Sequence, residues 1–189
     1  MSRSDPESLF TLGEILLATA GRVPRDDALV FPDSRQSYAQ LLARARTWAK
    51  AFMALGVKSG DHVGLLMTTQ PEFVEALFGA ALAGAAAVPI NARYAPDELA
   101  YLIENADIVS LVTTEKVAES VDFIARLNAA FPDVTQQADP ENLKIERAPR
   151  LRSLIVTGSG HHDGTIPASR IRDYAQTVPD GELDRRSAH

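Results

Sequence analysis

Three short polar segments are the candidates for ligand chemistry in this sequence. They are Thr68-Thr69-Gln70, Asn91-Ala92-Arg93-Tyr94, and the glycine-rich stretch from Gly158 to Gly164. Each follows a short apolar run of the kind that forms a buried strand. Open α/β sheets bind ligands beyond the carboxyl ends of their strands, so each segment occupies a position where a site is expected.

Arg93 is a candidate phosphate ligand, because its guanidinium presents a fork of donors. The alternative is a solvated arginine, or one paired with Asp97. The segment Thr68-Thr69-Gln70 is equally open to two interpretations. It is either a ligand-binding turn or simply the approach to a helix that begins at Pro71.

The stretch from Gly158 to Gly164 resembles a phosphate loop only superficially. It matches neither G-x-G-x-x-G nor G-x-x-x-x-G-K-[ST], and no lysine lies near it, so a plain surface connection is favoured. His161, His162 and Asp163 are metal-ligand types, but adjacent residues rarely converge on one ion. No metal site and no catalytic residue is therefore expected, and the chain lacks the G-x-S-x-G elbow of a hydrolase nucleophile.

Composition narrows the class of protein. The chain has 189 residues, a net charge of −6 and a pI of about 5.2, which argues against a general nucleic-acid binder. It contains no cysteine, so disulfides and thiolate sites are excluded. The N-terminal residues lack a signal-peptide core, and the longest apolar run is too short to span a bilayer. A cytoplasmic protein without a transmembrane segment is expected.

The segment from Asp61 to Asn91 must organise the fold. It predicts a strand at 62–67, an apolar helix at 71–83 and a second strand at 86–90. A helix between two strands makes a βαβ unit, whose strands are parallel.

The same pattern extends to both sides of this unit. We expect a doubly wound, mostly parallel α/β sheet with helices on both faces and a small N-terminal hairpin. Residues 1–7 are expected to be a disordered leader, 8–176 the α/β unit, and 177–189 a tail or the start of a linker. The other expected elements are helices at 8–20, 37–55 (with Ser37 and Gln40 as a capping box), 96–105, 115–130 (with Thr114 as N-cap) and 169–176, strands at 28–31, 35–37, 108–112 and 153–157, and a loop at 132–149.

Three motifs, in this order and spacing, resemble the N-terminal part of adenylate-forming enzymes, the group that contains acyl-CoA synthetases. They are Gln36-Ser37-Tyr38-Ala39-Gln40-Leu41, then Leu55-Gly56-Val57-Lys58-Ser59-Gly60-Asp61-His62-Val63, then Leu82-Ala83-Gly84-Ala85-Ala86-Ala87-Val88-Pro89-Ile90-Asn91. The resemblance runs from about Leu9 to Tyr174. The segment from Ala148 to Val156 is most similar to bacterial acyl-CoA ligases.

The resemblance implies a fatty-acid–CoA ligase as the parent protein. Such an enzyme uses ATP, Mg2+ and coenzyme A: a carboxylate displaces pyrophosphate from ATP, and the CoA thiol then displaces AMP. Arg93 is similar in position to an arginine that contacts the CoA nucleotide phosphates. The family often has asparagine where this chain has Thr68-Thr69, which weakens a role for that turn.

The motifs that hold the triphosphate in this family do not occur here. The four lysines, Lys50, Lys58, Lys116 and Lys144, lie outside any Gly/Ser/Thr-rich loop. This chain is therefore expected to be an inactive N-terminal fragment that binds no cofactor tightly and self-associates through uncovered surface. Two alternatives remain: a stand-alone, non-catalytic binding module with the same fold, and an unrelated flavodoxin-like nucleotide binder.

Overall fold

The computed structural model describes residues 11–118 and 121–187, and the expected leader at 1–7 lies outside them. The α-helices are α1 (Leu12–Arg22), α2 (Tyr38–Ala54), α3 (Pro71–Leu82), α4 (Pro96–Asn105), α5 (Phe123–Ala130), α6 (Ile171–Gln176) and α7 (Asp180–Ser187). The strands are β1 (Asp27–Phe31), β2 (Ser34–Ser37), β3 (His62–Leu66), β4 (Ala86–Pro89), β5 (Ile108–Thr114), β6 (Lys116–Ala118), β7 (Val121–Asp122), β8 (Ser153–Thr157) and β9 (Ile166–Pro167). Short 3-10 turns lie at Val134–Gln136 and Ala168–Arg170.

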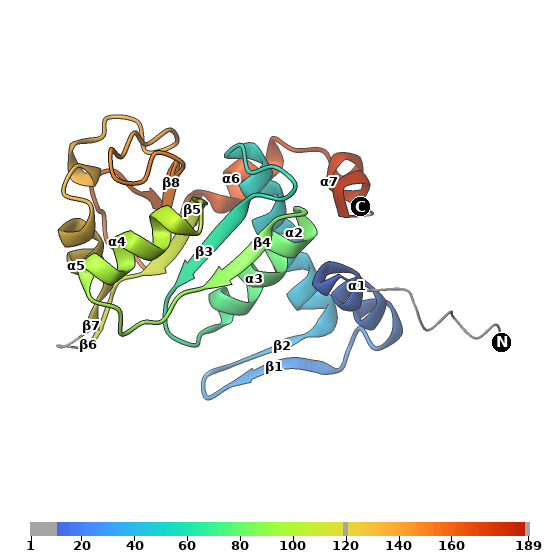
Figure 1. Ribbon diagram of the computed structural model, residues 1–189. Coiled ribbons are helices and arrows are strands. Elements are labelled where there is room, and N and C mark those ends of the chain that lie inside the picture. Colours follow the sequence, from blue (N-terminus) through green and yellow to red (C-terminus); the bar gives the residue numbers. More distant parts are fainter. Residues whose placement is uncertain (1–10, 119–120, 188–189) are drawn as a thin grey trace.

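A parallel sheet forms the centre of the molecule (Figure 1). Its strand order is β4-β3-β5-β8-β9, and each neighbouring pair is parallel. This order is that of a flavodoxin-like doubly wound sheet. The expected fold class is therefore confirmed, including the separate antiparallel hairpin of β1 and β2. The weakly patterned strand β9 was missed.

Helices cover both faces of the sheet. On one face α1, α2, α3 and α6 share a core with the β3 residues Val63 and Leu65. On the other face α4 and α5 share a second core with Leu111 of β5 and Leu154 of β8. The two middle strands β5 and β8 are buried along their whole length, as expected for strands covered on both sides.

Helix α2 forms as its sequence predicts. The Ser37 hydroxyl accepts from the Gln40 N–H, and the Gln40 side chain accepts from the Ser37 N–H, which completes the capping box. At its other end Gly56 has φ +82°, a left-handed conformation that costs glycine little. The helix packs closely on Gly79 of α3, where a Cβ would lie 2.5 Å from Cβ of Trp48.

The helix expected at 115–130 is wrong in its first half. Lys116–Ala118 and Val121–Asp122 pair as an antiparallel hairpin, and α5 begins only at Phe123. Its N-cap is Asp122, whose carboxylate accepts from the Ala125 N–H at 2.8 Å, and not Thr114. Apolar residues at helical spacing suggested a longer buried face, but the Val117 side chain is 46% exposed.

The segment expected as a loop at 132–149 is irregular but contributes to the core. Leu143 and Ile145 are buried with the α4 and α5 side chains. The Tyr174 hydroxyl of α6 donates to the Glu141 carboxylate, which ties this segment to the helix beyond β9. Burial and this carboxylate raise the pKa of Tyr174 to about 12.

Residues 180–187, within the stretch expected as a tail or linker, form α7. Arg46 of α2 pairs with Asp184 at 2.8 Å, and Lys50 pairs with Asp180 at 3.0 Å. Leu183 is fully buried beneath the helix. Figure 1 shows α7 standing at the C-terminal end of the chain. Among the described residues, no helix combines the length and apolar character needed to cross a membrane.

Candidate functional site

The carboxyl ends of β3, β5 and β8 meet at one edge of the sheet. The chain leaves β3 through α3 to reach β4 on one side, then returns through α4 to β5 on the other side of β3. The strand order therefore reverses between β3 and β5. In open α/β sheets, this switch point is where ligands bind.

Hydroxyl and amide side chains link the three strand ends. The Thr113 hydroxyl on β5 donates to the Leu66 carbonyl at 2.7 Å, and the Thr157 hydroxyl on β8 donates to the Thr113 carbonyl at 3.2 Å. Gln70, at the start of α3, donates from Nε2 to the Thr157 hydroxyl at 3.2 Å. The Gln70 side chain thus joins the β3 loop to β8, with β5 between them.

Glu115 follows β5 directly, and its carboxylate binds the loop after β8. The Gly160 N–H donates to Glu115 Oε1 at 2.6 Å, and His162 Nε2 lies 3.2 Å from the same oxygen. The backbone of Ser159 is a further donor. These hydrogen bonds, with that from His162 the largest influence, hold the pKa of the Glu115 carboxyl below its ordinary value.

The glycine-rich loop is therefore more than a plain surface connection. Gly158 has φ +125°, and a Cβ on it would lie 2.3 Å from a Glu115 carboxylate oxygen. His161 and Asp163 are 3.7 Å apart and highly exposed, whereas His162 turns toward Glu115. Within residues 11–118 and 121–187, no group of three or more His, Asp or Glu side chains is placed to hold a metal ion.

Arg93 lies apart from this network, in the turn between β4 and α4. Its backbone N–H donates to Asn91 Oδ1 at 3.0 Å, and its side chain is exposed. Asp97, the partner considered for it, pairs with Arg147 at 3.4 Å instead. Among the described residues, the Arg93 guanidinium forms no ion pair, so it is available to an external anion.

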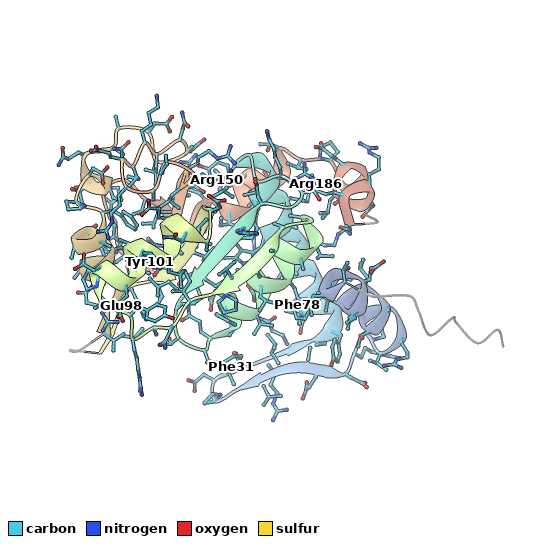
Figure 2. The ribbon with its side chains drawn as sticks, viewed as in Figure 1. Phe31, Phe78, Glu98, Tyr101, Arg150 and Arg186 are labelled. Carbon is cyan, nitrogen blue, oxygen red and sulfur yellow. The ribbon has the colours of Figure 1, made fainter. Side chains whose placement is uncertain are left out.

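A surface hollow of about 700 Å³ adjoins the Arg93 turn along α4. Tyr94 and Tyr101 line it, and Figure 2 shows Tyr101 and Glu98 on this helix. The two rim carboxylates are already engaged, since Glu98 accepts from the Ala95 N–H at 2.8 Å and Asp97 pairs with Arg147. Tyr101 is exposed, Tyr94 is partly buried, and Arg93 is not among the described residues that line the hollow.

The residues of the sheet edge do not suit a triphosphate with Mg2+. Among the described residues they offer the hydroxyls of Thr113 and Thr157, the amide of Gln70 and a single carboxylate, Glu115, that already has donors. No lysine of the chain lies in a loop of the Walker type. The donor set at the sheet edge therefore does not form a triphosphate site.

Sequence reasoning missed Glu115 and the role of His162. Glu115 was placed inside a helix, although it directly follows a buried strand. That position, a carboxylate at the carboxyl end of a buried parallel strand, is the signal that identifies it.

The strand order and the covering helices define an open, doubly wound α/β protein. The family described as AMP-binding enzyme matches residues 16–171, and the chain belongs to that family. The expectation from the three motifs is therefore confirmed.

Curated relatives carry the names of CoA ligases. YngI of Bacillus subtilis, which bears the name of an acyl-CoA synthetase, is 34% identical over 178 residues, covering 93% of this chain and 32% of its own length. The long-chain-fatty-acid–CoA ligase FadD13 of Mycobacterium tuberculosis is 37% identical over 148 residues, covering 77% of this chain and 28% of its own. This chain therefore spans about a third of the length of the relatives it matches.

Solved structures agree on the fold. The N-terminal domain of FACL13 from Mycobacterium tuberculosis superposes with a TM-score of 0.65 at 27% identity, over 90% of this chain and 37% of that one. The anthranilate CoA ligase AuaEII has a TM-score of 0.71 at 24% identity, over 95% of this chain and 30% of that one. At that identity the second match shows the fold alone.

Proposed function

We propose that these residues are the N-terminal part of an acyl-CoA synthetase that joins a carboxylic acid, of the fatty-acid type, to coenzyme A with ATP and Mg2+. The match to the AMP-binding enzyme family over 16–171 carries this proposal. The names of the relatives FadD13 and YngI support the CoA-ligase activity and, for FadD13, a fatty-acid substrate. Cytoplasmic location and self-association of the isolated chain stay predictions.

The 189-residue chain alone is proposed to be inactive. Its sequence has no Gly/Ser/Thr-rich loop with lysine, and within the described residues its sheet edge offers a single carboxylate. We expect no AMP release above the protein-free rate when the chain is mixed with ATP, Mg2+, CoA and a series of carboxylic acids from short to long. Multiple turnovers by the pure chain would contradict this expectation.

The coding sequence beyond His189 distinguishes the proposed ligase from the alternative, a non-catalytic binding module. A following Gly/Ser/Thr-rich loop with lysine supports the ligase. A stop codon there, combined with tight binding of a partner by the isolated chain, would favour a non-catalytic binding module.

Within the ligase, we propose that Arg93 contacts a CoA phosphate. A charge-assisted hydrogen bond from an exposed arginine is worth on the order of 1.4 kcal/mol, so Arg93→Ala should raise KM for CoA about tenfold. Formation of the acyl-adenylate, measured by ATP–pyrophosphate exchange, should be unchanged. Arg35→Ala is the matched control, because Arg35 is an exposed arginine on the hairpin that pairs with Asp27. Equal KM values in both variants would exclude Arg93 from the CoA site.

A further inference from the structure

The loop after β8 surrounds a carboxylate with converging donors. The Gly160 N–H lies 2.6 Å from Glu115 Oε1, His162 Nε2 lies 3.2 Å from the same atom, and the Ser159 backbone adds a donor. Successive backbone N–H groups in a turn of this kind form a concavity that binds anions. Here the anion is supplied by the chain itself, from a residue 45 positions earlier.

Two glycines make room for the bound oxygens. A Cβ on Gly158 or on Gly160 would lie 2.3 Å from an oxygen of the Glu115 carboxylate. At Gly160 the clash would fall on the ends of the Glu115 and His162 side chains, so a methyl group there would displace the carboxylate; at Gly158 the φ of +125° would add backbone strain. The loop after β8 therefore forms a carboxylate-binding site, and the Glu115 side chain fills it.

The contact between Glu115 and His162 is reachable from solvent. The Glu115 and His162 side chains are 29% and 26% exposed, so solvent and small solutes reach the contact. Among the described groups, the other charges close in sequence are His161 and Asp163, which pair with each other at 3.7 Å. The donors that face the carboxylate would remain in place if the Glu115 side chain left.

We propose that the loop from Gly158 to His162 is an oxyanion-binding site, occupied in the resting chain by Glu115 and able to take a small carboxylate or phosphate when that side chain is absent. The ligand class follows from the donors, which are backbone N–H groups and one imidazole and carry no geometric preference between the two anions. The site is separate from Arg93 and does not depend on the ligase proposal.

The test is chemical rescue of Glu115→Ala in the whole chain. Sodium acetate and, separately, sodium phosphate are titrated against chloride at matched ionic strength, with the amide NMR signals of Ser159 and Gly160 as the local readout. Saturable shifts of these amides are expected in E115A and not in the unmodified chain. At ten times the dissociation constant, the anion should also raise Tm by about 3–6 °C. The ratio of the two affinities identifies the preferred anion.

Two further variants separate site binding from a general salt effect. The double variant E115A/G160A places a methyl group where the oxyanion would sit and should not respond. The Asp97→Ala variant loses an exposed carboxylate elsewhere, and its amide signals should be as insensitive to the anion as those of the unmodified chain. Absence of saturable shifts in E115A, or equal shifts in E115A/G160A, would overturn the proposal. Should E115A be unfolded in chloride, acetate or phosphate must restore its circular dichroism, and failure of both to do so also overturns it.

Discussion

Replacing Gly164 by alanine is expected to destabilise the protein by about 2–5 kcal/mol. Gly164 has φ +70°, which costs a residue with a Cβ about 1–2 kcal/mol. A Cβ at this position would also lie 2.0 Å from the Val134 carbonyl oxygen, an atom of the backbone that cannot rotate away. Such overpacking lowers the free energy of unfolding by about a further 1–3 kcal/mol.

Gly60→Ala is the matched control for this substitution. Gly60 has φ +81°, but nothing lies within 4 Å of a Cβ built on it, so the control carries the backbone cost alone. Both changes affect the unfolded chain equally, so that contribution cancels. Urea unfolding with an unchanged m-value gives the two free energies. If Gly164→Ala lowers the free energy of unfolding no more than Gly60→Ala does, the close contact between the β8–β9 loop and Val134 does not exist.

Replacing Gly79 by valine should separate α3 from α2 and cost about 3 kcal/mol. An added Cβ would lie 2.5 Å from Cβ of Trp48 and 3.2 Å from both the Ala45 carbonyl oxygen and the Ala49 nitrogen. All three atoms belong to the backbone of α2 or to the root of a side chain, so the helices themselves must move. The sole tryptophan, Trp48, is 5% exposed and reports this directly.

Urea unfolding and the emission maximum of Trp48 measure this effect, with a shift to longer wavelength expected in the folded variant. Gly21→Ala, in α1, is the counterpart because nothing lies within 4 Å of its added Cβ. There the gain in helix propensity should stabilise the chain by about 0.5–1 kcal/mol. A stabilising Gly79→Val would mean that α2 and α3 do not pack at this glycine.

Local signals explain which parts of the fold the sequence predicts. The capping box at Ser37, Pro96 at the first position of α4 and the apolar runs of β3 and β4 each act within a few residues, and each element forms as expected. The helix expected at 115–130 failed because Val117 and Val121 fit a helical period and also a strand. The Asp122 cap, which starts α5 at Phe123, and the pairing of β6 with β7 favour the strand over the helix for these residues.

The candidate site depends on contacts that no local pattern encodes. Glu115 meets Gly160 across 45 residues, and Gln70 meets Thr157 across 87. Helix α7 has a single buried apolar residue, Leu183, and it forms ion pairs with α2 residues that lie 130 and 138 positions earlier in the sequence. The first two pairings follow from the strand order, which sequence periodicity alone does not provide.

The amide of Gln70 joins the loop after β3 to β8 through a single neutral hydrogen bond. Its hydrogen bond to the Thr157 hydroxyl joins two uncharged groups, and such a bond contributes only about 1 kcal/mol. Thermal motion alone therefore breaks it often, and water takes its place at little cost. The β3 loop is therefore tied to β8 less firmly than the loop after β8 is tied to Glu115, whose carboxylate accepts charge-assisted hydrogen bonds.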